Sequence, residues 1–134
     1  MIGIIDYGSG NIQAIRNIYK RLKIETFIVK EPQDVSLATK LILPGVGAFD
    51  EAISKLDQSG LRNTLDEVVL HNKVPVMGIC VGMQIMGDRS EEGNLKGLGW
   101  ISGSVKCFDI KQINIVPKLP HMGWNDISVS EHPI

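Results

Sequence analysis

The sequence predicts an α/β protein built on an open, mainly parallel β-sheet with helices on both faces, followed by a β-rich C-terminal stretch. Short, unbroken apolar runs are typical of parallel strands that are buried on both faces. These runs alternate with segments whose apolar residues recur at helical spacing, which favours strand-helix-strand units. The chain has 134 residues, so we expect one domain with one core.

The predicted elements follow one another along the first two thirds of the chain. Four apolar runs predict strands at residues 2–6, 26–30, 40–45 and 74–79. Apolar stripes predict helices at 12–22, 49–60, 61–71 and 81–86. Pro44 and Gly45 end the third predicted strand. Gly60 ends the predicted helix at 49–60.

The composition and the apolar spacing of the sequence change after Gly87. The segment DRSEEGNLKGLG is polar and rich in glycine, and the segments ISGSVKCF, INIVP and WNDISVS are short and favour strands. No apolar stripe with helical spacing returns in this part. We therefore expect short strands after residue 87.

Composition excludes several classes of function. The formal net charge is −1 and the basic residues are scattered, which argues against a nucleic-acid or anionic-membrane binder. Lys20, Arg21 and Lys23 form one small cluster that we interpret as a solvated helix end. Two cysteines without a CxxC motif, no leader and no long apolar run predict a cytoplasmic protein. The three histidines show no metal-ligand spacing, so we expect no metal and no cofactor.

Cys80 has the setting of a nucleophile. It follows a predicted strand, precedes a predicted helix, and stands between Gly78 and Gly82. A nucleophile elbow needs small residues at these positions, because the chain turns sharply there and projects the reactive atom above the sheet. The backbone N–H of Val81 could then face a developing oxyanion. The alternative is a small buried cysteine at a helix start, with glycines that allow close packing.

A second candidate lies at the end of the third strand, in PGVG. Gly45 and Gly47 flank Val46, and this flexibility lets a backbone N–H turn toward a negative oxygen. The carboxyl ends of parallel strands meet at one edge of a sheet, so we expect this turn beside Cys80. A plain strand-to-helix turn is the alternative.

Two further segments are weaker candidates. DYGSGN, residues 6–11, could cradle a phosphate or form a tight turn, and it lacks a complete phosphate-binding motif. LPHMGWN, residues 119–125, could expose an aromatic anchor for a partner or bury a tryptophan in a small satellite core. His121 in this loop is a possible base, although a structural role is the alternative.

These motifs together carry a resemblance. IDYGSGNI, LPGVGAF, GICVGMQ, GLGW and PHMGWN occur in this order along the whole chain. The sequence thereby resembles the class I (triad-type) glutamine amidotransferases and, within them, the glutaminase subunits of imidazole glycerol phosphate synthases from histidine biosynthesis. The resemblance implies that glutamine is the substrate and that Cys80 attacks its side-chain amide, which releases ammonia.

The resemblance also implies roles for other residues. Val46 and Val81 would supply the oxyanion hole, while Gly45, Gly47 and Gln84 would bind glutamine. Members of this family keep the PGVG segment in an inactive orientation until the partner binds its own ligand. That partner would be a (β/α)8-barrel cyclase that receives ammonia through a channel. The residues expected at that interface are Asn11, Met122 and Trp124.

The resemblance further implies a C-terminal portion with the histidine and glutamate of the triad. This sequence ends at EHPI without them, so we interpret residues 1–134 as one amidotransferase domain that lacks that portion. We expect little activity from the chain alone and self-association through uncovered apolar surface. Three alternatives stay open: a partner-binding module without catalysis, a paralogue that serves surface-sugar biosynthesis, and a flavodoxin-like nucleotide binder.

Overall fold

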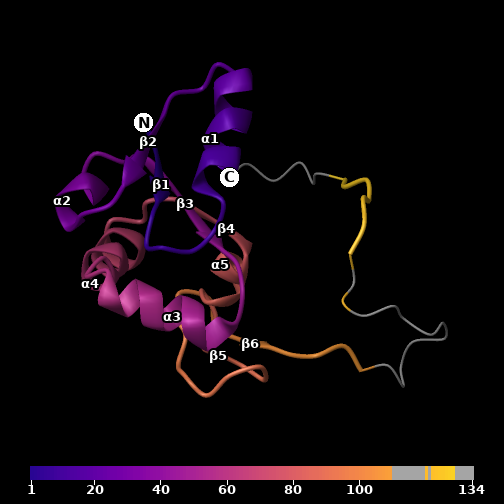
Figure 1. The fold of residues 1–134 in the computed structure, drawn as a ribbon. Helices are drawn as coiled ribbons and strands as arrows, with labels where there is room; N and C mark the ends of the chain where they lie inside the picture. Colours follow the sequence, from indigo (N-terminus) through magenta and orange to yellow (C-terminus); the bar gives the residue numbers. More distant parts are fainter. Residues whose placement is uncertain (110–119, 121, 129–134) are drawn as a thin grey trace.

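The central sheet has four parallel strands, as the sequence predicts. The structure is a computed structural model, and it describes residues 1–109, 120 and 122–128. The strands are β1 (Ile2–Ile5), β2 (Thr26–Val29), β3 (Lys40–Gly45) and β4 (Val76–Cys80). Their order in the sheet is β2-β1-β3-β4, which Figure 1 shows as a layer between helices. This order brings the carboxyl ends of β3 and β4 side by side.

The helices confirm the predicted alternation and add one element. They are α1 (Ile12–Arg21), α2 (Pro32–Val35), α3 (Phe49–Gln58), α4 (Arg62–Asp66) and α5 (Val81–Gln84), and a π-helical turn covers Glu67–His71. The helix α2 was not predicted from the sequence. It begins with a proline and is capped by reciprocal bonds between the backbone and the side chains of Glu31 and Asp34. The helix α5 is shorter than the predicted range.

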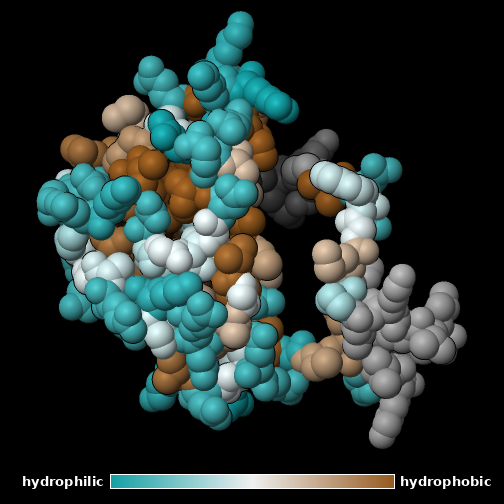
Figure 2. Space-filling model, in the orientation of Figure 1, coloured by the Kyte–Doolittle hydropathy of each residue, from teal (hydrophilic) through white to brown (hydrophobic). Residues whose placement is uncertain are grey.

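The main core lies between the sheet and the helices α3, α4 and α5. Ile5 and Leu43 from the strands pack there with Phe49 and Leu56 from α3 and with Ile85, which directly follows α5, and all five are fully buried. Figure 1 shows α1 on the opposite side of the sheet, and this helix contributes no fully buried residue. Apolar side chains also reach the surface between α1 and α2 in Figure 2.

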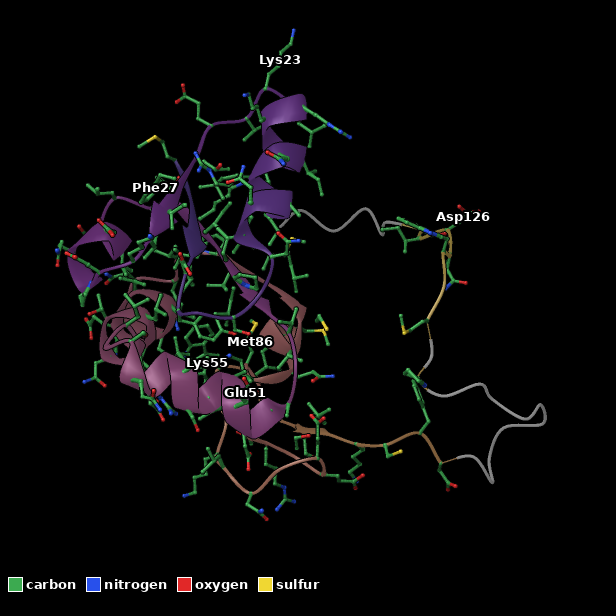
Figure 3. All side chains as sticks on the ribbon, viewed as in Figure 1. Lys23, Phe27, Glu51, Lys55, Met86 and Asp126 are labelled. Carbon is green, nitrogen blue, oxygen red and sulfur yellow. The ribbon has the colours of Figure 1, made fainter. Side chains whose placement is uncertain are left out.

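The outer surface of α3 is polar. Glu51 and Lys55 lie one helical turn apart on α3 (Figure 3) and pair at 2.7 Å. The Lys55 ammonium, through its hydrogen bond and its charge, lowers the pKa of the Glu51 carboxyl. Phe49, Ile53 and Leu56 on the same helix are, in contrast, buried; they belong to the same core as Met86, which lies outside α3. The helix therefore separates core from solvent as its apolar spacing predicts.

Where the structure describes the C-terminal stretch, it contains less strand than the sequence predicts. Two parallel two-residue strands pair there, β5 (Arg89–Ser90) and β6 (Ser104–Val105). Residues 113–117 lie outside the described part of the chain. Residues 124–128 form no strand and are exposed, so that part of the prediction is wrong. Strand propensity alone does not hold a segment extended in a sheet, because it needs a partner strand or a packed face.

The described residues contain neither a membrane-spanning helix nor a cluster of metal-ligating side chains. Within residues 1–109, 120 and 122–128, no helix has both the length and the apolar character needed to cross a membrane. In the same part of the chain, no group of three or more His, Cys, Asp or Glu side chains could hold a metal ion.

Candidate functional site

Cys80 occupies a sharp turn between β4 and α5. Its backbone angles, φ of 55° and ψ of −122°, lie in a region that residues other than glycine rarely adopt. The side chain is exposed at the end of the strand. The interpretation of Cys80 as a small buried residue is therefore wrong, and the predicted kink is confirmed.

The two flanking glycines allow α5 to lie directly on the strands. A Cβ atom at Gly78 would lie 2.7 Å from the Met83 nitrogen, and one at Gly82 would lie 2.8 Å from the Pro44 carbonyl carbon. Both distances are too short for any side chain. Glycine at these positions thus permits the backbone contact that fixes the direction of Cys80.

The PGVG turn lies next to Cys80, as predicted. Gly45 is the register partner of Cys80 in the parallel pair of β3 and β4. A Cβ atom at Gly45 would overlap the Gly82 amide nitrogen and lie 3.0 Å from the carbonyl carbon of Val81. The tight packing against α5 explains the glycine at this position. Residues 35 positions apart in the sequence therefore meet at one edge of the sheet.

Val46 makes an unexpected pair of hydrogen bonds. Its side chain is 56% exposed, but its backbone N–H donates to Oγ of Ser9 at 3.0 Å. The Ser9 hydroxyl in turn donates to the Val46 carbonyl at 3.1 Å. The Val46 amide is thus occupied in this conformation, so it can serve an oxyanion only after the bond to Ser9 breaks.

The DYGSGN segment is a tight turn rather than a complete phosphate site. Gly8 and Gly10 have φ of 86° and 94°, values that favour glycine. Asp6 accepts a hydrogen bond from the Gly8 N–H. Asn11 accepts one from the Ala14 N–H at 3.0 Å and so caps α1. These local bonds account for the segment without a ligand.

Gln84, on the helix that follows the elbow, lines a cavity of about 500 Å³, and Cys80 is not among its lining residues. Glu91, Glu92 and Lys106 also line it. The Glu92 carboxylate accepts from the Phe49 N–H at 3.1 Å, and that of Glu91 accepts from the Cys107 N–H at 2.9 Å. Neither glutamate is among the site residues that the sequence predicts. The one sequence feature that could have indicated them as site residues is their position in a polar loop soon after Gln84.

The loop after β5 is anchored to α4. Trp100 donates from its indole nitrogen to Asp66 at 2.6 Å, and Arg62 donates to the Gly97 carbonyl at 2.9 Å. Both contacts hold the GLGW segment against the helix. This gives the motif a structural role, because it fixes the base of the polar loop that carries the two glutamates.

Met122 and Trp124 are fully accessible. The side chains are 83% and 103% exposed, so the interpretation of Trp124 as part of a satellite core is wrong. Asn11 is exposed as well. The contact of these three residues with a partner stays a prediction.

His71 does not lie close to Cys80. It ends the π-helical turn before β4 and faces Glu67 at 3.9 Å, whereas Cys80 ends β4. Five strand residues separate the two ends of β4 by about 13 Å. His121, the possible base in the sequence, lies outside the described residues.

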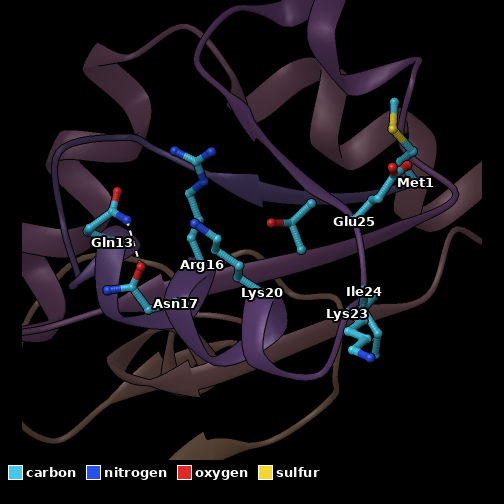
Figure 4. A pocket seen from close by; sticks show the side chains of 9 residues that line it. Met1, Gln13, Arg16, Asn17, Lys20, Lys23, Ile24 and Glu25 are labelled. Atoms are coloured by element: carbon cyan, nitrogen blue, oxygen red, sulfur yellow. Dashed lines mark hydrogen bonds between the residues drawn. The ribbon is translucent and has the colours of Figure 1, made fainter.

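A separate cavity of about 610 Å³ lies at the other end of the sheet. Arg16, Lys20 and Lys23 line it together with Met1 and Glu25, and Figure 4 shows these side chains around the end of α1. Lys20, Arg21 and Lys23 are all exposed, which confirms the predicted solvated helix end. No predicted site residue lies here.

The sequence matches the model of the family "Glutamine amidotransferase class-I" over residues 3–132. This chain belongs to that family. Its predicted resemblance to the class I amidotransferases is thus confirmed, and the elbow at Cys80 is the feature of the structure that fits it best.

Several members of the family are closely similar in sequence. "Imidazole glycerol phosphate synthase subunit HisH" of Bdellovibrio bacteriovorus is 52% identical over 128 residues, which cover 95% of this chain and 62% of that protein. The protein of the same name from Leptospira interrogans is 48% identical and covers 96% and 63%. "Imidazole glycerol phosphate synthase subunit HisH 2" of Pseudomonas aeruginosa is 47% identical and covers 100% and 65%. The chain thus spans less than two thirds of the length of these relatives.

The fold agrees with the family. A solved structure described as "Crystal structure of glutamine amidotransferase" superposes with a TM-score of 0.59 at 20% identity, over 67% of this chain and 47% of the other. At this identity the similarity concerns the fold alone. It confirms the predicted α/β class with a mainly parallel sheet.

Proposed function

We propose that this chain is the glutaminase part of an imidazole glycerol phosphate synthase, which hydrolyses glutamine to glutamate and ammonia for histidine biosynthesis. The observation that carries the proposal is the backbone of Cys80. Its φ of 55° at the end of β4 holds an exposed thiol beside the PGVG turn, and such strain is kept where it serves a function. The similarity to the HisH subunits supports the choice of reaction.

In the proposed reaction, the sulfur of Cys80 attacks the side-chain carbonyl carbon of glutamine. The carbonyl oxygen becomes an oxyanion, which the N–H groups of Val81 and of Val46 stabilise after the latter turns away from Ser9. The proton given up by the Cys80 thiol ends on the amide nitrogen, the C–N bond breaks, ammonia leaves, and a glutamyl thioester remains on Cys80. Water then hydrolyses the thioester to glutamate and the free thiol.

The cavity beside Gln84 suits the charged end of the substrate. Free glutamine carries an α-ammonium and an α-carboxylate group. Glu91 and Glu92 bring negative charge to this cavity and Lys106 brings positive charge, so both ends of the zwitterion find an opposite charge. Gln84, half-buried on α5, would add an amide that hydrogen-bonds the substrate.

The proposed partner is a (β/α)8-barrel cyclase that uses the ammonia. Met122 and Trp124 support a partner surface, because large apolar side chains that are this exposed are typical of interface anchors. The same observation favours a second function, a partner-binding module without catalysis. A paralogue that delivers ammonia in surface-sugar biosynthesis would share the same glutaminase site.

A labelling experiment separates these functions. The 134-residue chain is treated with a glutamine-derived diazoketone, which alkylates a thiol with loss of nitrogen gas, and the rate at each cysteine is read by mass spectrometry. Cys80 and Cys107 are both exposed. Cys107 lines the same cavity as Gln84, so it compares a thiol near the amino-acid portion of the reagent with the thiol at the elbow. We expect Cys80 to react about a hundredfold faster, because in the proposed reaction only the elbow, beside the PGVG turn, aligns a thiol with the reactive end of the reagent.

Saturation of the rate and protection by glutamine would identify a specific site. Iodoacetamide, which has no amino-acid portion, provides the matched reagent control. Equal rates at Cys80 and Cys107 with the diazoketone would contradict the glutaminase proposal and favour the partner-binding module.

A further inference from the structure

We propose that Asp50 is a positioning residue that holds the polar loop, residues 91–95, so that the Glu92 carboxylate faces the substrate cavity. Asp50 lies in the first turn of α3, and it is not among the residues that line this cavity. Hydrogen bonds join α3 to the loop. Their effect on substrate binding rests on the proposed function, in which the charged end of glutamine enters the cavity.

The Asp50 carboxylate holds the end of the polar loop at two points. Its two oxygens accept from the backbone N–H of Asn94 at 2.9 Å and from that of Leu95 at 3.0 Å. These residues lie 44 and 45 positions further along the chain, so the bonds fix the loop to a different element. Both bonds are strong because the acceptor is charged.

Gly93 lets the carboxylate lie directly against the loop backbone. A Cβ atom at Gly93 would overlap Oδ1 of Asp50 and lie 2.5 Å from its Cγ. The φ of Gly93 is not positive, so the contact with Asp50, and not the backbone conformation, is what a larger residue would disturb. An added methyl group would therefore push Asp50 away from the two amides without removing its charge.

Glu92 makes the reciprocal contact from the loop to the helix. It lines the cavity of about 500 Å³, and its carboxylate accepts from the Phe49 N–H at 3.1 Å. Phe49 begins α3, and the N-cap residue, Ala48, supplies no side-chain bond, so Glu92 takes the place of that cap. The same turn of α3 thus receives Glu92 and, through Asp50, anchors the loop that carries it.

The start of the polar loop is fixed independently of Asp50. Ser90 is 7% exposed and belongs to β5, which pairs with β6. Its hydroxyl accepts from the Glu92 N–H at 3.1 Å. Loss of the Asp50 bonds would therefore release the far end of the loop and leave the strand pair in place. Glu92 lies between the two anchors, so the direction of its side chain depends on both.

The test compares Asp50→Asn with the native chain. Hydrogen exchange of the Asn94 and Leu95 amides, followed by NMR, should become about tenfold faster, because asparagine offers one accepting oxygen and no charge. The half-saturating concentration of the glutamine-derived diazoketone at Cys80 should rise about tenfold, with the maximal rate within about twofold of the native value. Iodoacetamide should alkylate Cys80 at the native rate, since it does not use the cavity.

Two further variants separate position from charge. Gly93→Ala keeps the Asp50 carboxylate but pushes it from the loop, so it should raise the half-saturating concentration by a similar factor. Glu51→Gln is the matched control, because it removes one negative charge from the same turn of α3, and the Glu51 carboxylate pairs with Lys55. This variant should change neither the exchange of the loop amides nor the alkylation of Cys80.

A reagent without the α-amino group tests what the loop positions. The deaminated diazoketone has no ammonium group for Glu92 to face. The native chain, Asp50→Asn and Gly93→Ala should therefore alkylate Cys80 with this reagent at second-order rate constants that agree within about twofold. A loop that merely supports the fold would change the rates of both diazoketones alike.

The possible failures are distinguishable. If Cys80 of the native chain reacts with the diazoketone no faster than Cys107, the proposed function fails, and the role of Asp50 in it fails as well. If native Cys80 reacts specifically and both loop variants keep the native half-saturating concentration, the positioning role is overturned while the function stands. Equal losses with the deaminated reagent would also overturn it, because Asp50 would then not act through Glu92.

Discussion

Replacement of Gly82 by alanine tests the structural basis of the elbow. The new Cβ atom would overlap the Leu43 carbonyl oxygen and lie 2.8 Å from the Pro44 carbonyl carbon. Both neighbours are backbone atoms of a buried central strand, so neither can rotate away. The helix α5 has to move outward by more than about 0.5 Å to restore van der Waals contact.

This movement has an energetic and a functional cost. Overpacking of a buried contact lowers the free energy of unfolding by about 1–3 kcal/mol, and the rigid neighbours favour the upper end of that range. With a urea m-value of about 2 kcal/mol/M, the midpoint of unfolding should fall by about 1–1.5 M. Because α5 carries Gln84 and follows Cys80, alkylation of Cys80 by the diazoketone should slow by about a hundredfold.

The assay is urea unfolding followed by far-ultraviolet circular dichroism. Gly123→Ala is the matched control, because no atom lies within 4 Å of the added methyl group and the φ of Gly123 is not positive. Its free energy of unfolding should stay within about 0.5 kcal/mol of the native value. If Gly82→Ala is equally harmless, close packing of α5 on β3 does not form the elbow.

Two further predictions concern polar groups that are partly or fully buried. Asp66→Ala removes the acceptor of the Trp100 indole N–H. The free energy of unfolding should fall by about 1 kcal/mol. The fluorescence emission of Trp100 should shift to the red, whereas the emission of the exposed Trp124 should stay unchanged. Burial raises the pKa of Tyr7 above its ordinary value of 10.0, so the folded chain holds this proton more tightly than the unfolded chain. That stability is fully present below pH 10 and is lost as the pH rises through the higher pKa of the folded state. Tyr7→Phe should therefore flatten the decline of unfolding free energy above pH 10.

Several properties of this protein were determined by local sequence. The apolar runs and stripes gave the strands and helices because burial of one face requires that spacing. Gly78, Cys80 and Gly82 defined the elbow because only glycine lets two backbones touch on either side of a strained residue. The motifs also gave the family, which the match over residues 3–132 confirms.

Other properties were decided by the tertiary structure alone. The sequence predicts that the PGVG turn and Cys80 share one edge of the sheet, but only the strand order β2-β1-β3-β4 makes their strands neighbours and sets Gly45 opposite Cys80. The same order brings Ser9 onto Val46, so the amide predicted to serve an oxyanion is already bonded. Hydrogen bonds between distant segments depend on which strand ends become neighbours. That choice is made by packing of the whole sheet, and propensity along the chain does not encode it.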